Sequence, residues 1–187
     1  MTDLIVSCTA ALDQPSAPAC TTDYGETVVA FAVMKEGGTF TVAGSDNPTA
    51  AEFTTAIAAG EVAFYKGLSN GHKVQTGATE LSGDDTVTGG TERYDVQYRV
   101  EGRIKVFDEG IKRATEKLDR FTSIRLWFFT NKNWVFGGVE GYKATPNFDQ
   151  TIIEGRGNPP YIPFFFDFTA IGADYAKYDA DYADLSN

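Results

Sequence analysis

Residues 94–106 read YDVQYRVEGRIKV, and this stretch decides the fold. Apolar side chains occupy every second position from first to last, with Gly102 as the one gap, and charged or polar side chains lie between them. A β-strand turns successive side chains to opposite faces, so the alternation predicts a strand with one buried and one charged face. At about 3.3 Å per residue this strand spans roughly 40 Å, about twice the usual length. Such a strand either crosses a large sandwich or barrel or projects as one arm of a hairpin.

The charged face of this strand is a candidate for contacts between subunits. It mixes positive and negative side chains, and such a mixture can set the register of one chain against another. We therefore predict that the face is an assembly surface whose members are Arg99, Glu101, Arg103 and Lys105.

Two other segments have the pattern of short helices. Thr49 and Glu52 form a capping box ahead of residues 50–59, and Gly60 is placed to end that helix in the left-handed conformation. A second helix is expected over residues 109–120, capped by Asp108. Its buried stripe is predicted from helical spacing and consists of Ile111, Ala114, Leu118 and Phe121.

The remaining patterns predict short strands joined by turns. Asn70-Gly71 has the signature of a tight hairpin turn, and the Gly-, Thr- and Asp-rich residues 76–90 are interpreted as a surface loop with at most a short strand. Residues 123–130 are apolar on both parities, which indicates a central strand covered on both sides. Further strands are expected at residues 28–34, 62–65, 72–74, 134–136, 150–154 and 161–169.

This order of elements predicts one mainly β (α+β) domain with extended termini. We expect an antiparallel β-sandwich or barrel over residues 26–170, with one or two flanking helices. A Pro-containing extended arm over residues 1–25 precedes it, and an acidic, Tyr-rich tail over residues 171–187 follows it. The tail has helical spacing, so we predict a helix that docks on a neighbouring subunit through Tyr175, Tyr178 and Tyr182, with a frayed acidic tail as the alternative.

The composition of the 187 residues argues for a soluble protein and against several functional classes. The sequence has no apolar run long enough to span a bilayer and no secretory signal, so we expect a protein made and kept in the cytosol or packaged into a particle assembled there. A net charge of -10 does not suit binding of nucleic acid by counterion release. Cys8 and Cys20 are expected to be free thiols, with a disulfide between them as the alternative.

No group of residues indicates catalysis or a cofactor. His72 is the one histidine, expected on a hairpin surface, and two cysteines with one histidine cannot complete a zinc site. The sequence also lacks a phosphate-binding loop. We therefore expect no enzymatic activity, no metal or other cofactor and no small-molecule substrate. The alternative is a carbohydrate-binding β-sandwich module or a glycan-processing enzyme, in which sugars would stack on Trp127, Trp134, Tyr142 and Tyr161.

Over roughly residues 50–169 the chain resembles the tail-tube-like virion proteins of tailed bacteriophages. The shared features are a long amphipathic strand, a surface helix, an aromatic strand ending in Thr130-Asn131, and a closing strand after a Gly/Pro loop. The resemblance implies a structural protein of the virion, made in the host cytoplasm, that stacks as rings around a DNA channel. Its implied partners are copies of itself and other virion proteins, with at most passive contact with DNA and none with a membrane. The tail tube, a connector and a head decoration remain possible positions in the particle.

Overall fold

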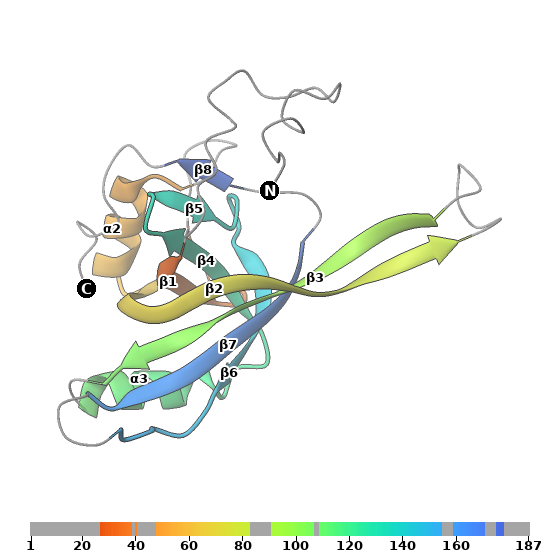
Figure 1. The fold of residues 1–187 in the computed structure, drawn as a ribbon. Coiled ribbons are helices and arrows are strands. Elements are labelled where there is room, and N and C mark those ends of the chain that lie inside the picture. Colours follow the sequence, from red (N-terminus) through yellow and green to blue (C-terminus); the bar gives the residue numbers. More distant parts are fainter. Residues whose placement is uncertain are drawn as a thin grey trace.

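The computed structural model describes residues 27–38, 40, 48–82, 91–106, 109–154, 159–170 and 175–177 (Figure 1). Its centre is a closed, antiparallel six-stranded barrel in the order β1-β2-β3-β7-β6-β4, which closes because β4 also pairs with β1. Of the two architectures expected from the sequence, the structure has the barrel. The barrel strands are β1 (Val28–Lys35), β2 (Ala63–Ser82), β3 (Thr91–Lys105), β4 (Ile124–Thr130), β6 (Tyr142–Phe148) and β7 (Tyr161–Ala170).

Side chains from alternate strand positions fill the interior of the barrel. Phe31 of β1 is fully buried, and its ring centroid lies 5.1 Å from that of Phe164 and 4.9 Å from that of Phe166. The predicted buried face of β7 is confirmed, since Ile162 and Phe168 are buried together with these two phenylalanines. The barrel is therefore closed around a packed aromatic core.

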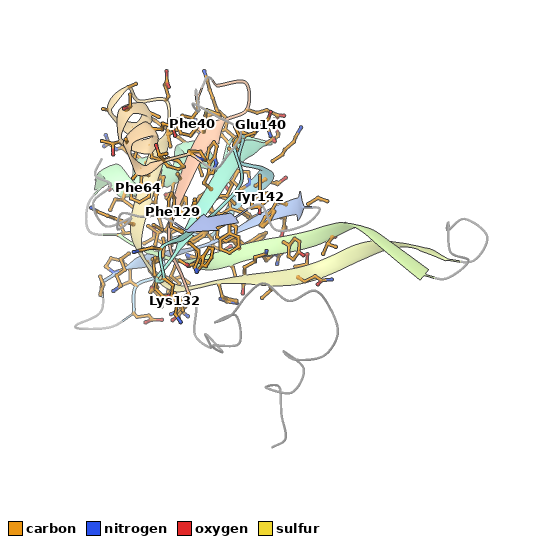
Figure 2. The ribbon with its side chains drawn as sticks, turned by 90° about the horizontal axis from the view of Figure 1, so that it is seen from above. Phe40, Phe64, Phe129, Lys132, Glu140 and Tyr142 are labelled. Carbon is orange, nitrogen blue, oxygen red and sulfur yellow. The ribbon has the colours of Figure 1, made fainter. Side chains whose placement is uncertain are left out.

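A second core lies outside the barrel wall, beneath helix α2 (Ala50–Ala58). The capping box of Thr49 and Glu52 starts this helix as predicted. Phe53 of α2 packs against Trp127 and Phe129 of β4, and Figure 2 labels Phe129 among the side chains on this side of the barrel. The residues on the other face of β4 belong to the core inside the barrel. Strand β4 is therefore covered on both sides, as the sequence predicted.

Helix α3 (Glu109–Leu118) packs against the barrel core through Ile111 and Leu118. The predicted buried stripe is wrong at Phe121, which is 42% exposed because the helix ends before it. Thr115, which the pattern did not single out, is buried instead, and its hydroxyl donates to the carbonyl oxygen of Lys112. Two short strands, β5 (Trp134–Phe136) and β8 (Tyr175–Lys177), extend the sheet beyond β4.

Two local predictions are wrong, and one strand was not predicted. Asn70-Gly71 is no hairpin turn but an irregularity inside β2, which continues to Ser82 through part of the expected loop 76–90. Residues 150–154 form no strand but a single bridge, between Ile152 and Tyr161. Strand β6 was not predicted at all. The N-terminal arm with Cys8 and Cys20, the cap at Asp108 and residues 83–90 lie outside the described residues.

We expect Leu118→Ala to lower the free energy of unfolding by about 1–3 kcal/mol, less than for a fully buried leucine, because Leu118 is only partly buried. Lys117→Ala is the matched control, since Lys117 is exposed on the same turn of α3 and should change stability little. Urea unfolding followed by circular dichroism measures both. Equal losses would mean that α3 does not hold the barrel through this face.

Candidate subunit interface

The most distinctive surface feature is an arm formed by β2 and β3, which project together beyond the barrel (Figure 1). Residues 78–82 of β2 pair with residues 91–96 of β3. The pairing of β2 with β1 ends at Gly71, and the pairing of β3 with β7 begins at Val96. We define the arm as residues 78–82 and 91–95. Among the described residues these two strand segments pair only with each other.

Both outer edges of the arm therefore have no strand beside them within the described part of the chain. A closed barrel leaves no sheet edge available, whereas an open edge presents backbone N–H and C=O groups that can pair with another chain. A two-stranded ribbon is also only marginally stable alone in water. The arm thus has both the geometry and the energetic reason to pair with a further strand.

Strand β2 is tightly constrained at the point where it leaves β1, before it reaches the arm. Asn70 has a left-handed φ of 55°, and the register of β2 against β3 shifts between Ser69 and His72. A Cβ atom at Gly71 would collide with the carbonyl oxygen of Val28, so only glycine fits where β2 passes β1. This irregularity lets β2 serve first as a barrel strand and then as a strand of the arm.

Arg99 is the first residue of the predicted charged face, on the outside of the barrel. Its Nε and Nη2 donate to the two carboxylate oxygens of Asp167 on β7, at 2.7 and 2.9 Å. Its guanidinium also stacks 4.1 Å from the ring centroid of Phe165. The hydrogen bond with Asp167 raises the pKa of Arg99 above its ordinary value. Arg99 is thus held in place by its own chain.

The next two members of the face are also engaged within the chain. The Oε1 atom of Glu101 lies 2.9 Å from the Nε2 atom of His72 on β2. The Nη1 atom of Arg103 lies 3.8 Å from a carboxylate oxygen of Glu154, and the guanidinium of Arg103 is 4.5 Å from the ring centroid of Tyr161.

Lys105 completes the face. It is exposed at the end of β3. The structure therefore brings the four predicted residues onto one outer face, where three of them are already paired with side chains of their own chain.

The predicted tail helix is wrong where the structure describes it. Residues Tyr175–Lys177 form strand β8, which pairs antiparallel with β5 and places Tyr175 opposite Phe136. This segment lies on its own chain, on the short β5 extension of the sheet. Tyr178 and Tyr182 lie outside the described residues. Their docking on a neighbouring subunit stays a prediction.

The aromatic residues that were considered for sugar stacking mostly lie inside the molecule. Trp127 is fully buried and its indole N–H donates to the carbonyl oxygen of Gly138, while Tyr142 and Tyr161 are 6% and 9% exposed. An open groove of about 620 Å³ at the base of the arm is lined mainly by hydroxyl-bearing and charged residues. Its Arg99 and Asp167 are paired with each other.

The described residues hold no group of three His, Cys, Asp or Glu side chains placed to bind a metal ion. In the same part of the chain no helix has the length and apolar character needed to cross a membrane. Neither a protein-family model nor a curated protein sequence matches this chain.

Proposed function

We propose that this chain is a self-assembling structural protein of a tailed-bacteriophage virion, of the tail-tube type. In this proposal it is made in the host cytoplasm and acts in the virion. Its partners are copies of itself and other virion proteins, and contact with DNA in a central channel is passive. It needs no cofactor and converts no substrate.

The observation that carries the proposal is the arm, which in the described part of the chain adds two open strand edges to a closed barrel. Association through such edges forms continuous sheets between chains and suits a protein whose task is to build a wall. The net charge of -10 is a second support, because an acidic wall would let DNA slide without sticking.

Negative-stain electron microscopy and sedimentation of the purified full-length chain test this proposal. We expect rings, tubes or discrete oligomers that grow with protein concentration between about 1 and 100 μM. A species that stays at the monomer mass of 20.3 kDa over this range, at both low and high salt, would contradict self-assembly.

Reversing two charges on the outer face of β3 should weaken association. In Arg103→Glu with Lys105→Glu, a carboxylate replaces the guanidinium beside Glu154, and the exposed Lys105 changes sign. We expect at least a ten-fold rise in the dissociation constant measured by sedimentation, with an unchanged far-UV circular dichroism spectrum. The matched control is Arg113→Glu with Lys117→Glu on the exposed side of α3, which makes the same charge change away from this face. Equal weakening by both pairs would indicate a general charge effect.

A further inference from the structure

Two consecutive isoleucines are exposed in the segment that leads into β7. Ile152 is 41% exposed and Ile153 is 79% exposed, and in the described part of the chain only Phe121 is another large apolar side chain of comparable exposure. Single apolar side chains are common on protein surfaces, so exposure alone does not mark a site. Two further observations distinguish the isoleucines: the hydrogen bonds that hold their backbone, and the residues that lie beside them.

Hydrogen bonds hold this segment against the barrel. The backbone N–H of Ile152 donates to the carbonyl oxygen of Tyr161 at 2.8 Å, and the N–H of Tyr161 donates back to the carbonyl oxygen of Ile152 at 3.0 Å. The hydroxyl of Tyr161 donates to Oε1 of Glu154 at 2.9 Å. The N–H of Val106, which follows β3, donates to the carbonyl oxygen of Pro160 at 2.8 Å. Because the segment is already ordered, binding of another chain here would cost little conformational entropy.

The register of the strands places Ile152 beside the charged outer face. Lys105 of β3 is the register partner of Tyr161 on β7, and Tyr161 forms the bridge with Ile152. Side chains directly opposite each other in antiparallel strands lie on the same face, so these three residues form one row. The guanidinium of Arg103 lies over the ring of Tyr161 in this row, and Ile153 continues the apolar surface from Ile152. An apolar centre thus adjoins two cationic side chains, which is the usual composition of a protein interface with a polar rim.

We propose that Ile152 and Ile153 are the apolar anchor through which the chain binds a second copy of itself, with Arg103 and Lys105 at the rim of the contact. This inference rests on the proposed self-assembly and names the apolar side chains that contribute to it. Charge complementarity favours a second copy as the partner, because the rim is cationic and a chain with a net charge of -10 carries an excess of acidic groups. Burial of the isoleucines supplies affinity, and the rim charges orient the partner.

Two double variants of nearly equal shape test the anchor. Ile152→Val with Ile153→Val keeps two β-branched apolar side chains, whereas Ile152→Thr with Ile153→Thr replaces a methyl group of each valine by a hydroxyl. Both should keep the far-UV circular dichroism spectrum of the full-length chain, since the isoleucines are exposed and the bridge to Tyr161 is made by backbone atoms. We expect the threonine variant to associate at least about ten-fold more weakly than the valine variant in sedimentation, because burying hydroxyl groups without partners opposes association.

The outcomes separate this inference from the proposed function. If the unchanged chain assembles and the threonine and valine variants associate equally, the isoleucines are not the anchor and this inference alone is overturned. If the unchanged chain stays monomeric, self-assembly is contradicted and the anchor falls with it. Co-sedimentation with vesicles of phosphatidylcholine and phosphatidylglycerol is a third measurement. Vesicle binding by the unchanged chain that the threonine variant loses would assign the isoleucines to a membrane surface and overturn the proposal.

Hydroxyl-radical footprinting tests the anchor in the unchanged full-length chain. Oxidation of Ile152 and Ile153 should fall several-fold between the dilute monomer and the assembled protein, because both side chains leave water at the contact. Phe121, the exposed apolar side chain that follows α3, is the internal reference and should keep its oxidation rate. Assembly that leaves the oxidation of both isoleucines unchanged would overturn the proposal.

Discussion

A chain with a shortened arm is expected to stay folded and to lose most of its assembly. In this variant residues 80–93 are replaced by Asn-Gly, which joins the register partners Thr79 and Tyr94 through a tight hairpin turn. The barrel is untouched because β3 pairs with β7 from Val96 onward. We expect an unchanged thermal transition, and a dissociation constant for self-association raised at least a hundred-fold when measured by sedimentation.

The matched control replaces only residues 83–90 by Asn-Gly, so that β2 still ends at Ser82 and β3 still begins at Thr91. Both open edges are retained in this control, and it should assemble like the full-length chain. A loss of assembly in the control would assign the contact to residues 83–90 instead. If the shortened chain assembles normally, the arm is not the contact and the proposed function loses its main support.

Phe53→Ala is expected to destabilise the fold strongly by weakening the core outside the barrel. The ring of Phe53 is fully buried, with its centroid 5.4 Å from that of Phe129 and 5.7 Å from that of Trp127. Removing a phenylalanine from such a site costs about 3–5 kcal/mol, through lost burial and the cavity left behind. Chemical denaturation followed by tryptophan fluorescence measures the loss, and the emission of Trp127 should shift to longer wavelength because water reaches its ring.

Thr54→Ala is the control for this change. Thr54 is the next residue of α2, it is exposed, and its hydroxyl donates to the carbonyl oxygen of Ala50 within the helix. We expect a change within about 0.5 kcal/mol, since exposed helix positions tolerate alanine well. A loss for Phe53→Ala as small as that of the control would mean that α2 is not anchored on β4.

Elements with strong local patterns could be predicted from the sequence. The alternation of β3, the two apolar faces of β4 and the aromatic face of β7 each follow from the two-residue period of a strand. The start of α2 follows from the side-chain chemistry of Thr49 and Glu52. In these segments local preference and tertiary packing agree, so the sequence pattern alone is sufficient to predict the secondary structure and the buried face.

Segments whose structure is decided by distant partners could not be predicted. Asn70-Gly71 has the residues of a hairpin turn, yet β1 and β3 run past it on either side and hold it as a bend within one strand. The tyrosine spacing of the tail suggests a helix, but Tyr175–Lys177 pairs with β5. Pairing with a partner far away in sequence outweighs a weak local preference in both places.

The candidate interface likewise has one part that the local sequence predicts and one part that depends on distant strands. Alternation correctly placed Arg99, Glu101 and Arg103 on one face, because it depends on β3 alone. Their partners Asp167 and His72 depend on how β3 is aligned with β7 and β2, and no local signal specifies that alignment. The register could have been proposed only by matching Arg99 to an acidic residue on a neighbouring strand.

The order of strands around the barrel also governs when the protein can fold during synthesis. Strand β7 lies between β3 and β6, and it is the last barrel strand to leave the ribosome. Strand β1 emerges first but must wait for β4, since Val28 pairs with Thr130. Pairings so distant in sequence form slowly, and unpaired edges stay exposed in the meantime. A nascent chain released before residue 161 would leave β3 and β6 without their shared neighbour, so incomplete chains are expected to aggregate more readily than finished ones.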